Sequence, residues 1–409
     1  ILFSSSFFYL FGGIQQSGCY YSLQKYFILR REAMIRVIHS VSVMNRAGQE
    51  TFLMNVYRRI NREEIQFDFQ CSDKGEGDYD SEIKAAGGKI LYLGENRIKI
   101  PYLKYFGDIL LQYRFFKQYP VYDVFHIHTY HAFNAWLSII GAKMAGMQNI
   151  ILHSHNSQGM HPRLHKIFRA LLSVMKIERY ACAEEAAEWM FGKKCIQKNR
   201  VHIVKNGIVP ENFIFSALDR DKKRKELNIE GKIAVGHVGR FAKQKNHEFL
   251  IDIFAEFLQL EEEAILLLIG TGELEPYIRG KVCELGLQNR VKFLGVREDI
   301  KELLWAMDIF VLPSLYEGLS VAAVEAQASG VPCIFSDGIT EECKIAKNVV
   351  FVPLKASSRF WAEQIAKYSR SGHINSELSI NQAGYNIDET VKFLEKNYAY
   401  ITKNKKVPK

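Results

Sequence analysis

Two glutamates lie eight positions apart near the C-terminal end of the chain, at Glu317 and Glu325. The continuous apolar run before them, residues 308–313, predicts a short buried strand, and the small apolar residues at 320–327 predict a helix. At about 1.5 Å per residue, Glu325 would lie roughly 12 Å along the axis from Glu317. Carboxylates accept hydrogen bonds from vicinal hydroxyls, so this spacing fits the two sugars that flank a diphosphate. Solvated glutamates on an ordinary amphipathic helix would give the same spacing.

The segment Gly318-Leu319-Ser320 lies where that helix would begin. The first N–H groups of a helix have no partner within it, and the positive end of the helix dipole attracts phosphate. Gly318 has no Cβ to keep an anion away from the backbone. The segment therefore predicts a phosphate site between two carboxylates that bind hydroxyls.

Two basic residues lie upstream on a second predicted strand-to-helix loop. The apolar run 233–238 ends at Gly239 and Arg240, Lys245 follows, and a helix is expected from about residue 248. In an open parallel sheet, ligands bind at such carboxyl ends of strands. Fixed cations there can neutralise a diphosphate leaving group, a role that other enzymes give to Mg²⁺. Basic loop residues are solvated in many proteins, so it is the pairing with the glutamate helix that favours a site.

The length and composition fit a folded protein of two domains. The 409 residues suffice for two cores, and 48% hydrophobic and 12% aromatic residues exclude a disordered chain. The formal charge of +9 suggests an anionic partner: a phosphate substrate, an anionic membrane surface or nucleic acid. No basic arm or nucleic-acid-binding motif is present, so we expect no nucleic-acid partner. The seven cysteines are scattered without a C-x-x-C pair, which indicates a reducing compartment and neither a zinc site nor a disulfide framework.

Short apolar runs alternate with helical patterns from Met34 onward, which predicts βα units and parallel sheets. Both halves of the chain follow this scheme, so we expect an α/β protein with two Rossmann-like domains. The strands of the first are expected at residues 35–41, 66–71, 89–93, 124–128, 150–153, 180–183 and 201–204, and those of the second at 233–238, 264–269, 291–294, 309–313, 332–335 and 349–352.

The domain boundaries follow from the same pattern. The first domain is expected at 34–208 and the second at 209–384, with the boundary beside the turn signal Lys205-Asn206-Gly207. A final helix begins near residue 385 and, with a basic tail, makes up 385–409. Residues 1–33 precede the first methionine, and the apolar residues 1–14 carry no positive n-region. We interpret them as an N-terminal extension that is foreign to the native protein, with a membrane anchor as the alternative.

Several of these motifs together resemble one enzyme family. Gly239-Arg240 with Lys245, the turn 269–272, the segment 293–295 and the two spaced glutamates are similar, in this order, to the retaining GT-B glycosyltransferases of the group 1, or family 4, type. The most similar branch contains bacterial enzymes of capsule and exopolysaccharide biosynthesis. The resemblance covers residue 34 to the end. It implies two Rossmann-like domains that face each other across a cleft, with the C-terminal helix crossing back to the first domain.

The resemblance also implies roles for residues of the second domain. The donor in such enzymes is a nucleotide diphosphate sugar, most often a UDP-sugar. The residues expected at the diphosphate are Gly239, Arg240, Lys245 and the amides of Gly318, Leu319 and Ser320. Glu317 would bind the donor hexose, Glu325 the ribose hydroxyls, and Arg297 would offer backbone hydrogen bonds to the nucleobase. No nucleophile or metal cofactor is implied, because a leaving phosphate oxygen is thought to take the acceptor proton during a front-face displacement.

In the first domain, the resemblance assigns Gly48 and a histidine. Gly48 would let this domain approach the donor phosphate from across the cleft. His155 falls where the family places a histidine near the donor sugar, and it would support positive charge at the anomeric carbon through its ring or backbone. General-base catalysis by histidine stays an alternative. His153 is interpreted as structural, and of His126 and His128 only His128 is a candidate for the cleft.

Asp78 and Asp80 have the D-x-D spacing with which metal-dependent GT-A transferases hold Mn²⁺ or Mg²⁺. They lie in a polar loop just before a helix that is expected at 82–86. We therefore interpret them as caps of that helix and expect no metal site.

Acceptor recognition falls to the first domain. Residues 161–177 predict a basic amphipathic helix, which would either rest on an anionic membrane or pack on the sheet with its basic side chains solvated. The membrane placement suits a lipid-linked acceptor. The sequence thus predicts a cytoplasmic enzyme, peripheral on the inner face of the plasma membrane if that placement holds. It would extend a saccharide acceptor with retention and without a metal. The alternatives are a GT-B sugar-nucleotide epimerase and a noncatalytic nucleotide-sugar-binding subunit of a synthesis complex.

Overall fold

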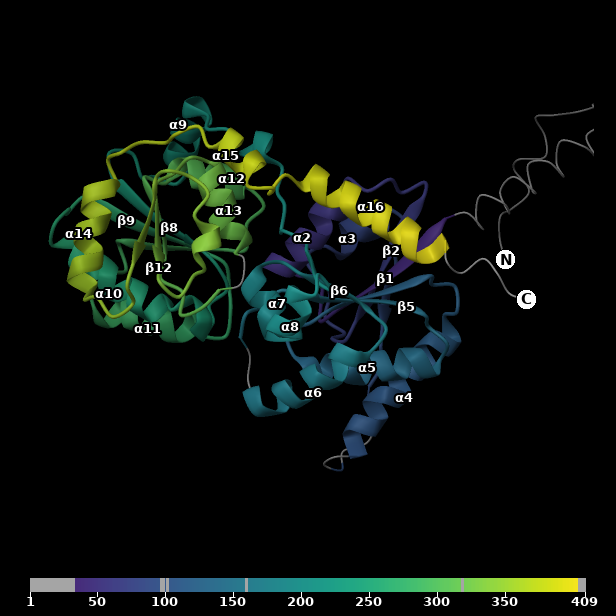
Figure 1. Ribbon diagram of the computed structural model, residues 1–409. Helices are drawn as coiled ribbons and strands as arrows, with labels where there is room; N and C mark the ends of the chain where they lie inside the picture. Colours follow the sequence, from purple (N-terminus) through teal and green to yellow (C-terminus); the bar gives the residue numbers. More distant parts are fainter. Residues whose placement is uncertain (1–33, 96–99, 101–102, 159–160, 318–319, 404–409) are drawn as a thin grey trace, which may run out of the picture.

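The computed structural model describes residues 34–95, 100, 103–158, 161–317 and 320–403. Residues 1–33 lie outside the described residues, as do two of the predicted phosphate-binding residues, Gly318 and Leu319. The chain forms two separate parallel sheets, each covered by helices (Figure 1). We call the part built on the first sheet the first domain and the part built on the second sheet the second domain.

The first sheet has seven strands in the order β3-β2-β1-β4-β5-β6-β7, and all of its strand pairs are parallel. The strand order reverses between β1 and β4, and open α/β sheets bind ligands at the carboxyl ends of strands at such a point. The strands are β1 (Ile35–Val41), β2 (Ile65–Cys71), β3 (Ile90–Tyr92), β4 (Val124–His128), β5 (Asn149–Ser154), β6 (Glu178–Ala181) and β7 (His202–Ile203).

The second sheet has six strands in the order β10-β9-β8-β11-β12-β13, again all parallel, and its order reverses between β8 and β11. Its strands are β8 (Ile233–Val238), β9 (Ala264–Ile269), β10 (Val291–Gly295), β11 (Ile309–Leu312), β12 (Cys333–Ser336) and β13 (Val349–Val352). Every one of these strands, in both sheets, matches an apolar run of the sequence with ends shifted by at most two residues. The predicted fold of two Rossmann-like domains is therefore confirmed.

Helices cover both faces of the first sheet (Figure 1). On one face lie α4 (Leu103–Gln118), α5 (Ala132–Met144) and α6 (Pro162–Val174), and on the other lie α2 (Gly48–Tyr57), α3 (Asp80–Ala85) and α16 (Ile387–Lys403). Consecutive residues of a strand point to opposite faces. Ile38 accordingly packs in the core that contains α5, whereas Val37 packs in the core that contains α2.

The helices of the second domain surround its sheet in the same way. They are α9 (Ala217–Glu226), α10 (His247–Leu258), α11 (Glu275–Glu284), α12 (Ile300–Ala306), α13 (Val321–Ala328), α14 (Ser358–Tyr368) and α15 (Glu377–Gln382). The first domain also contains α7 (Glu184–Phe191) and α8 (Lys193–Gln197), and three short 3₁₀ helices are η1 (Pro210–Phe213), η2 (Lys243–Lys245) and η3 (Glu341–Cys343). Within the second core, Phe254 of α10 and Trp361 of α14 are fully buried beside β8 and β9.

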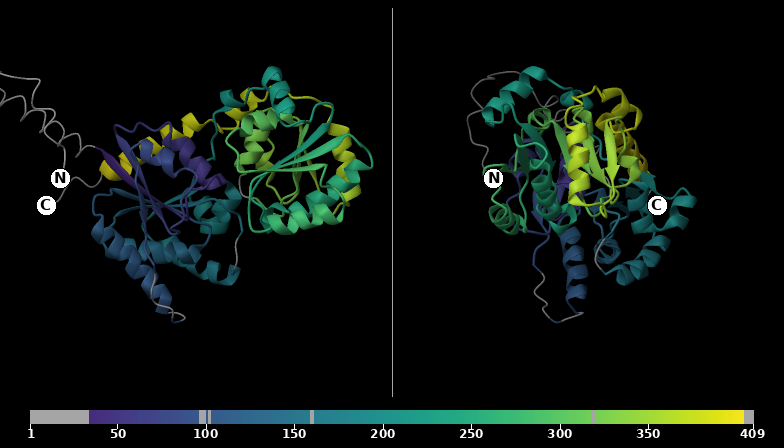
Figure 2. Two further views of the ribbon diagram at one scale, coloured as in Figure 1. Left: turned by 180° about the vertical axis from the view of Figure 1, so that it is seen from behind. Right: turned by 90° about the vertical axis from the view of Figure 1, so that its left-hand side faces the viewer.

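The chain returns to the first domain at its C-terminal end. The backbone N–H of Ile208 donates to the carbonyl of Tyr385, and that of Ile387 donates to the carbonyl of Ile208, both at 2.8 Å. The outgoing and returning segments are thus hydrogen-bonded side by side. From this crossing, α16 runs along the first sheet, and its Val391 and Tyr398 share a core with β1 and β2 (Figure 2).

Asp78 and Asp80 do not cap α3, which corrects one expectation. The residue before the helix is Tyr79, whose side chain makes no capping hydrogen bond, and Asp80 is already the first helical residue. Asp78 instead accepts a hydrogen bond from the backbone N–H of Arg46 at 2.9 Å. Its carboxylate therefore ties this loop to the turn before α2.

Candidate active site

An ion pair lies where the ends of β8 and β11 meet. Lys245 ends η2, which follows β8, and Glu317 lies in the loop after β11. Because the two strands are neighbours in the sheet, the loops converge, and Lys245 Nζ lies 2.6 Å from Glu317 Oε1. The hydroxyl of Ser314 donates to the same oxygen at 2.8 Å, and Gln244 Nε2 donates to Oε2 at 3.3 Å. With Glu317 only 8% exposed, these contacts fix the orientation of its carboxylate.

Backbone segments meet closely at the ends of β8 and β9. A Cβ on Gly239 would lie 3.1 Å from Lys245 Cδ. Gly270 has a φ of +127°, and a Cβ there would lie 2.3 Å from the carbonyl oxygen of Gly239. Larger residues would push these loops apart. The glycines therefore let the loops after β8 and β9 pack closely beside the side chain of Lys245.

Arg240 lies apart from this ion pair. Its side chain is 70% exposed, and its guanidinium lies 3.1 Å from Glu273 Oε2. Its charge also acts on Glu50 of α2, whose pKa is raised to about 7 by burial while Arg240 opposes the rise. Arg240 of the second domain thus lies close to the first turn of α2 in the first domain. The structure brings together only one of the two predicted diphosphate cations, Lys245, with Glu317.

Two helix N-termini from different domains face each other beside this site. Gly48 is the first residue of α2, and a Cβ there would lie 3.9 Å from Val321 Cγ2, in the first residue of α13. Neither preceding residue, Ala47 or Ser320, makes a side-chain capping hydrogen bond. In α13 the N–H of Ala323 donates to the carbonyl of Ser320, so it is the N–H groups of the first two residues of each helix that we expect to face a ligand. This arrangement suits an anion bound between the domains.

Glu325 lies on α13, one turn before its end. Burial raises the pKa of its carboxyl group to about 8. Burial raises the pKa of Tyr79 in the first domain, and the charge of Glu325 adds to this rise. The two glutamates singled out in the sequence thus have different surroundings, since Glu317 is ion-paired and Glu325 is desolvated.

The side chain of Arg297 is engaged within the second domain. Its Nε and Nη2 atoms lie 2.7 and 2.6 Å from the two carboxylate oxygens of Asp299. Lys223 Nζ contacts the same carboxylate at 2.7 Å, and these bonds lower the pKa of Asp299. The role expected for Arg297 at a nucleobase runs through its backbone and stays a prediction.

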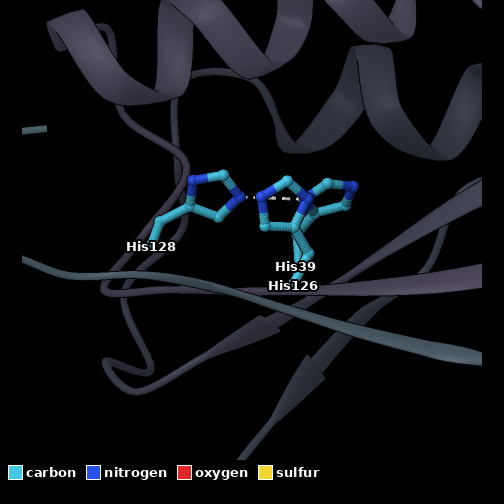
Figure 3. Close-up of side chains that lie close together, drawn as sticks. All are labelled: His39, His126 and His128. Carbon is cyan, nitrogen blue, oxygen red and sulfur yellow. Dashed lines mark hydrogen bonds between the residues drawn. The ribbon is translucent and has the colours of Figure 1, made fainter. Parts of the chain in front are cut away.

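His155 follows β5 and is almost completely buried. Its Nε2 lies 2.9 Å from Nδ1 of His128. Nε2 of His128 in turn lies 3.0 Å from Nδ1 of His39 (Figure 3). Burial lowers the pKa of His155 to about 3. His153, interpreted as structural, is fully buried. The sequence did not point to His39, because only the pairing of β1 with β4 places it beside His128.

A cavity of about 400 Å³ opens next to Glu317, between the two domains. One wall comes from the first domain and the other from the loop around Gly338; the lining residues are Ser157, Gln158, Arg169, Glu185, Glu188, Trp189, Tyr316, Glu317, Asp337, Gly338, Ile339 and Thr340. Two hydrogen bonds join these walls: Ser157 Oγ donates to the Glu317 carbonyl at 3.2 Å, and Thr340 Oγ1 donates to Glu185 at 2.6 Å. On the first-domain wall, the sequence pointed only to Arg169, which lies in the basic helix expected at 161–177; the other residues of this wall belong to no motif.

Comparison of the sequence with known families and proteins gives a consistent result. Residues 219–386 match the family "Glycosyl transferases group 1". The protein named "Putative glycosyltransferase EpsF" of Bacillus subtilis (strain 168) is 34% identical over 370 residues, which are 87% of this chain and 94% of EpsF. The capsular polysaccharide biosynthesis glycosyltransferase CapH of Staphylococcus aureus is 26% identical over 84% of this chain and 93% of its own.

Solved structures with the same fold include glycosyltransferases. Anabaena Alr3699/HepE in complex with UDP and glucose superposes with a TM-score of 0.72 and 18% identity, over 89% of this chain and 99% of HepE. WaaG, a glycosyltransferase involved in lipopolysaccharide biosynthesis, gives a TM-score of 0.66 and 15% identity, over 90% and 99% of the two chains. These likenesses show the GT-B fold, and the similarity to EpsF extends over most of both chains. The chain therefore belongs to the group 1 glycosyltransferases.

Proposed function

We propose that this enzyme transfers a sugar from a UDP-sugar to a lipid-linked saccharide of a growing polysaccharide repeat unit, with retention of anomeric configuration and without a metal cofactor. The observation that carries the proposal is the Lys245–Glu317 ion pair beside two facing helix N-termini. An ammonium group and a carboxylate held 2.6 Å apart can bind two neighbouring parts of a sugar diphosphate. The ammonium group binds the phosphate, and the carboxylate binds the sugar hydroxyls.

The donor diphosphate is expected between the domains. The N-termini of α2 and α13 offer N–H groups there, and Lys245 and Arg240 supply positive charge from the loop after β8. Fixed cations of this kind stabilise a diphosphate leaving group without a metal. The UDP complex of HepE, which has the same fold, supports the choice of UDP. Glu325 on α13 is then the candidate for the ribose hydroxyls.

Retention follows from a front-face displacement. The bond between the anomeric carbon and the phosphate oxygen breaks, the acceptor oxygen bonds to the same face, and the acceptor proton passes to the leaving phosphate oxygen. This route needs no protein nucleophile, which agrees with Glu317 being held by Lys245 and Ser314. A sugar-nucleotide epimerase would instead need an acid-base group free to exchange protons. Glu317 is ion-paired and His155 is hydrogen-bonded to His128, so neither favours that alternative.

The acceptor is expected in the cavity next to Glu317. Trp189 lines it, and its indole Nε1 donates to the carbonyl of Tyr130 at 2.8 Å, which fixes the ring. An aromatic ring, the carboxylates of Glu185 and Glu188 and the guanidinium of Arg169 suit a saccharide that carries a phosphate. The Escherichia coli relative that is 24% identical over 77% of this chain and 82% of its own is named as a galactosyltransferase acting on a diphosphoundecaprenol-linked sugar.

The helix α6, which contributes Arg169 to this cavity, supports a membrane-bound acceptor. No helix in the described part of the chain has both the length and the apolar character to span a bilayer. However, α6 exposes an apolar row along one face: Leu164, Ile167, Leu171 and Val174. Arg163 and Lys166 are exposed on the same helix. Packing on the sheet leaves this row uncovered, whereas insertion at an anionic membrane surface would cover it.

Calorimetric binding of UDP, GDP and ADP in excess EDTA tests the donor site. Tight binding of UDP alone supports the proposal, and binding only after Mn²⁺ is restored would overturn metal independence. Incubation with the UDP-sugar and a polyprenyl-diphosphate sugar, followed by NMR of the product, tests retention through the anomeric coupling constant.

Sedimentation with anionic vesicles tests the membrane surface. We expect Ile167→Glu to reduce binding, because it places a carboxylate in the apolar row of α6. Leu218→Glu is the matched control, since Leu218 is 80% exposed on α9 of the other domain. Equal vesicle binding by both variants and the wild type would remove α6 from the proposal.

A further inference from the structure

Five buried histidines gather at the carboxyl ends of three neighbouring strands of the first sheet. They are His39 of β1, His126 and His128 of β4, His153 of β5 and His155 just after β5. Burial lowers the pKa of each ring, so all five are neutral at neutral pH. A neutral imidazole has one N–H donor and one acceptor nitrogen, so its neighbours decide which nitrogen carries the hydrogen.

Three of these rings form a hydrogen-bonded chain. His39 Nδ1 lies 3.0 Å from His128 Nε2, and His128 Nδ1 lies 2.9 Å from His155 Nε2. Figure 3 shows the first of these contacts, with His126 beside it. His126 is outside the chain, because its Nδ1 is 2.8 Å from the hydroxyl of Tyr398 on α16. His128 is thus the central ring, with both nitrogens engaged.

The same contacts argue against a metal ion in the cluster. Two groups of three histidines have ring nitrogens within 4.8 Å of one another: His39, His126 and His128, and His128, His153 and His155. Both groups need His128, whose two nitrogens are already bonded to the neighbouring rings. In addition, the rings of His126 and His128 are stacked at 4.3 Å with an interplanar angle of 26°, so their in-plane lone pairs run side by side. A tetrahedral site would need lone pairs that converge on one point.

The hydrogen bonds that link His39, His128 and His155 can run in either of two directions, and the groups beside the two terminal rings favour one of them. If His155 donated toward His39, the hydrogen of His39 would lie on Nε2, a buried atom with no hydrogen-bond partner among the described residues. A buried N–H without an acceptor is rarer than an unused lone pair. At the other end, the hydrogen of His155 would lie on Nδ1, which is also buried without a partner at hydrogen-bond distance in the described part of the chain, but Asn206 interacts with this ring and opposes the lowering of its pKa by burial. Of the two ends, that of His155 has an interacting polar group, which favours donation from His39 toward His155.

We propose that His39 and His128 are positioning residues, each donating Nδ1–H to Nε2 of the next ring, so that His155 is held with its hydrogen on Nδ1 toward Asn206. The effect on catalysis rests on the proposed function, in which His155 lies near the donor sugar. Neither ring nitrogen of His155 is then left to take the acceptor proton.

The hydrogen-bonded histidines also fix the segment that follows β5. Two residues beyond His155, Ser157 Oγ donates to the carbonyl of Glu317 across the domain interface at 3.2 Å. The hydrogen bond from His128 fixes the ring of His155, and the ring fixes the backbone from which Ser157 extends. The neutral histidines therefore influence Glu317 indirectly, because they position the segment from which Ser157 contacts it.

The wild-type protein tests the chain directly. Two-bond ¹⁵N–¹H correlation spectra of protein labelled in its histidines separate rings with hydrogen on Nδ1 from rings with hydrogen on Nε2. We expect the Nδ1–H form for His39, His128 and His155, assigned by single substitutions. The Nε2–H form of His128 or His155 would overturn the proposal, as would a metal-bound shift of His128 after addition of Zn²⁺.

A matched pair of variants tests the consequence. We expect His128→Phe to change the tautomer of His155 and to lower kcat by about tenfold to a hundredfold, the scale of a small misplacement, with UDP affinity unchanged. His126→Phe replaces a ring on the same strand and leaves the chain intact, so the tautomer of His155 and kcat should stay near wild type. Equal losses of kcat in both variants would show that these histidines contribute only to packing. If the wild type transfers no sugar, the proposed function is wrong, but the spectra still show whether the three histidines are hydrogen-bonded in the proposed direction.

Discussion

The two domains present different chemistry at the strand ends that face each other. In the second domain, Lys245 and Glu317 form an ion pair in loops that Gly239 and Gly270 bring close together. In the first domain, the ends of β1, β4 and β5 carry buried histidines whose pKa values are lowered by burial. The second domain also buries two neutral histidines near Lys245, His237 and His247, but there the strand ends carry fixed charges as well, whereas in the first domain the rings stand without them. Charge suits a diphosphate, whereas neutral groups add no charge beside the carbon that reacts.

The largest effect is expected where fixed charge is removed. Lys245→Ala takes away the cation from Glu317, which is 8% exposed, and leaves a buried carboxylate unpaired. Removing one partner of such a pair lowers the free energy of unfolding by about 3 to 5 kcal/mol. Because the substitution also removes the cation expected at the diphosphate, we expect sugar transfer to be lost and UDP binding to weaken. Calorimetry with UDP and a transfer assay measure the two effects.

Lys243→Ala is the control for that substitution, since Lys243 lies two positions away in the same 3₁₀ helix and is exposed. It should bind UDP and transfer sugar like the wild type. Full transfer by Lys245→Ala would show that the site is elsewhere, and equal losses in both variants would point to a general change of charge.

Acid should break the first domain before the second. An unfolded histidine takes up a proton near pH 6.5, whereas His39 and His155 in the folded protein do so only near pH 3. The folded state therefore binds fewer protons below pH 6.5, and the free energy of unfolding falls as the pH falls. Each such histidine contributes a loss of about 1.4 kcal/mol at pH 5.5. In the described part of the chain, the first domain has six histidines whose pKa burial lowers, the five of the cluster and His165, whereas the second has three, His237, His247 and His373. The loss of stability in acid should therefore be about twice as large in the first domain.

Hydrogen exchange at pH 7.5 and 5.5 measures this difference between domains. We expect faster exchange at pH 5.5, after correction for intrinsic rates, in β4 and β5 than in β8 and β9. His153→Phe should reduce the acid sensitivity, because His153 is fully buried and neither of its ring nitrogens has a hydrogen-bond partner among the described residues. Equal acid sensitivity of both sheets would contradict the electrostatic contrast.

Within the second domain, the two glutamates should separate sugar from nucleotide. Burial raises the pKa of Glu325 to about 8, so its carboxyl is protonated at pH 7 and ionises as the pH rises. The ionised form is the stronger acceptor for ribose hydroxyls. We therefore expect tighter UDP binding at pH 9 than at pH 7, and roughly tenfold weaker binding without this slope in Glu325→Gln.

Glu317→Gln is the comparison for Glu325→Gln. It should bind free UDP near the wild-type affinity and lose preference for the UDP-sugar over UDP, because Glu317 is the candidate for the hexose. Titration of both ligands over the pH range measures these effects. A Glu325→Gln protein with wild-type UDP affinity and slope would remove its ribose role.

The fold was largely predictable because buried parallel strands are continuous apolar runs, such as 264–269 and 309–312. Helix starts were less so. The helix expected at 82–86 begins two residues earlier, at Asp80. Asp80 was interpreted as a cap, yet it is helical and buried.

The contacts of the site could not be predicted, because they depend on strand order. Lys245 and Glu317 were identified separately, and only the pairing of β8 with β11 joins them. His39 was not predicted for the same reason, since it contacts His128 through the pairing of β1 with β4. Spacing in the sequence identifies residues on one element, whereas sheet topology decides which elements meet.

The smallest effect is expected at Gly48, where the two domains approach through backbone alone. A Cβ there would lie 3.9 Å from Val321 Cγ2, an ordinary contact, and alanine favours a helix over glycine by about 1 kcal/mol. Gly48→Ala should therefore fold with an equal or slightly higher Tm. Its added methyl group would occupy space beside the N-terminus of α13, so kcat/KM for the UDP-sugar should fall modestly while UDP binding to the second domain is retained. A variant with full activity would show that α2 does not approach the donor phosphate, and charge recognition would then belong to the second domain alone.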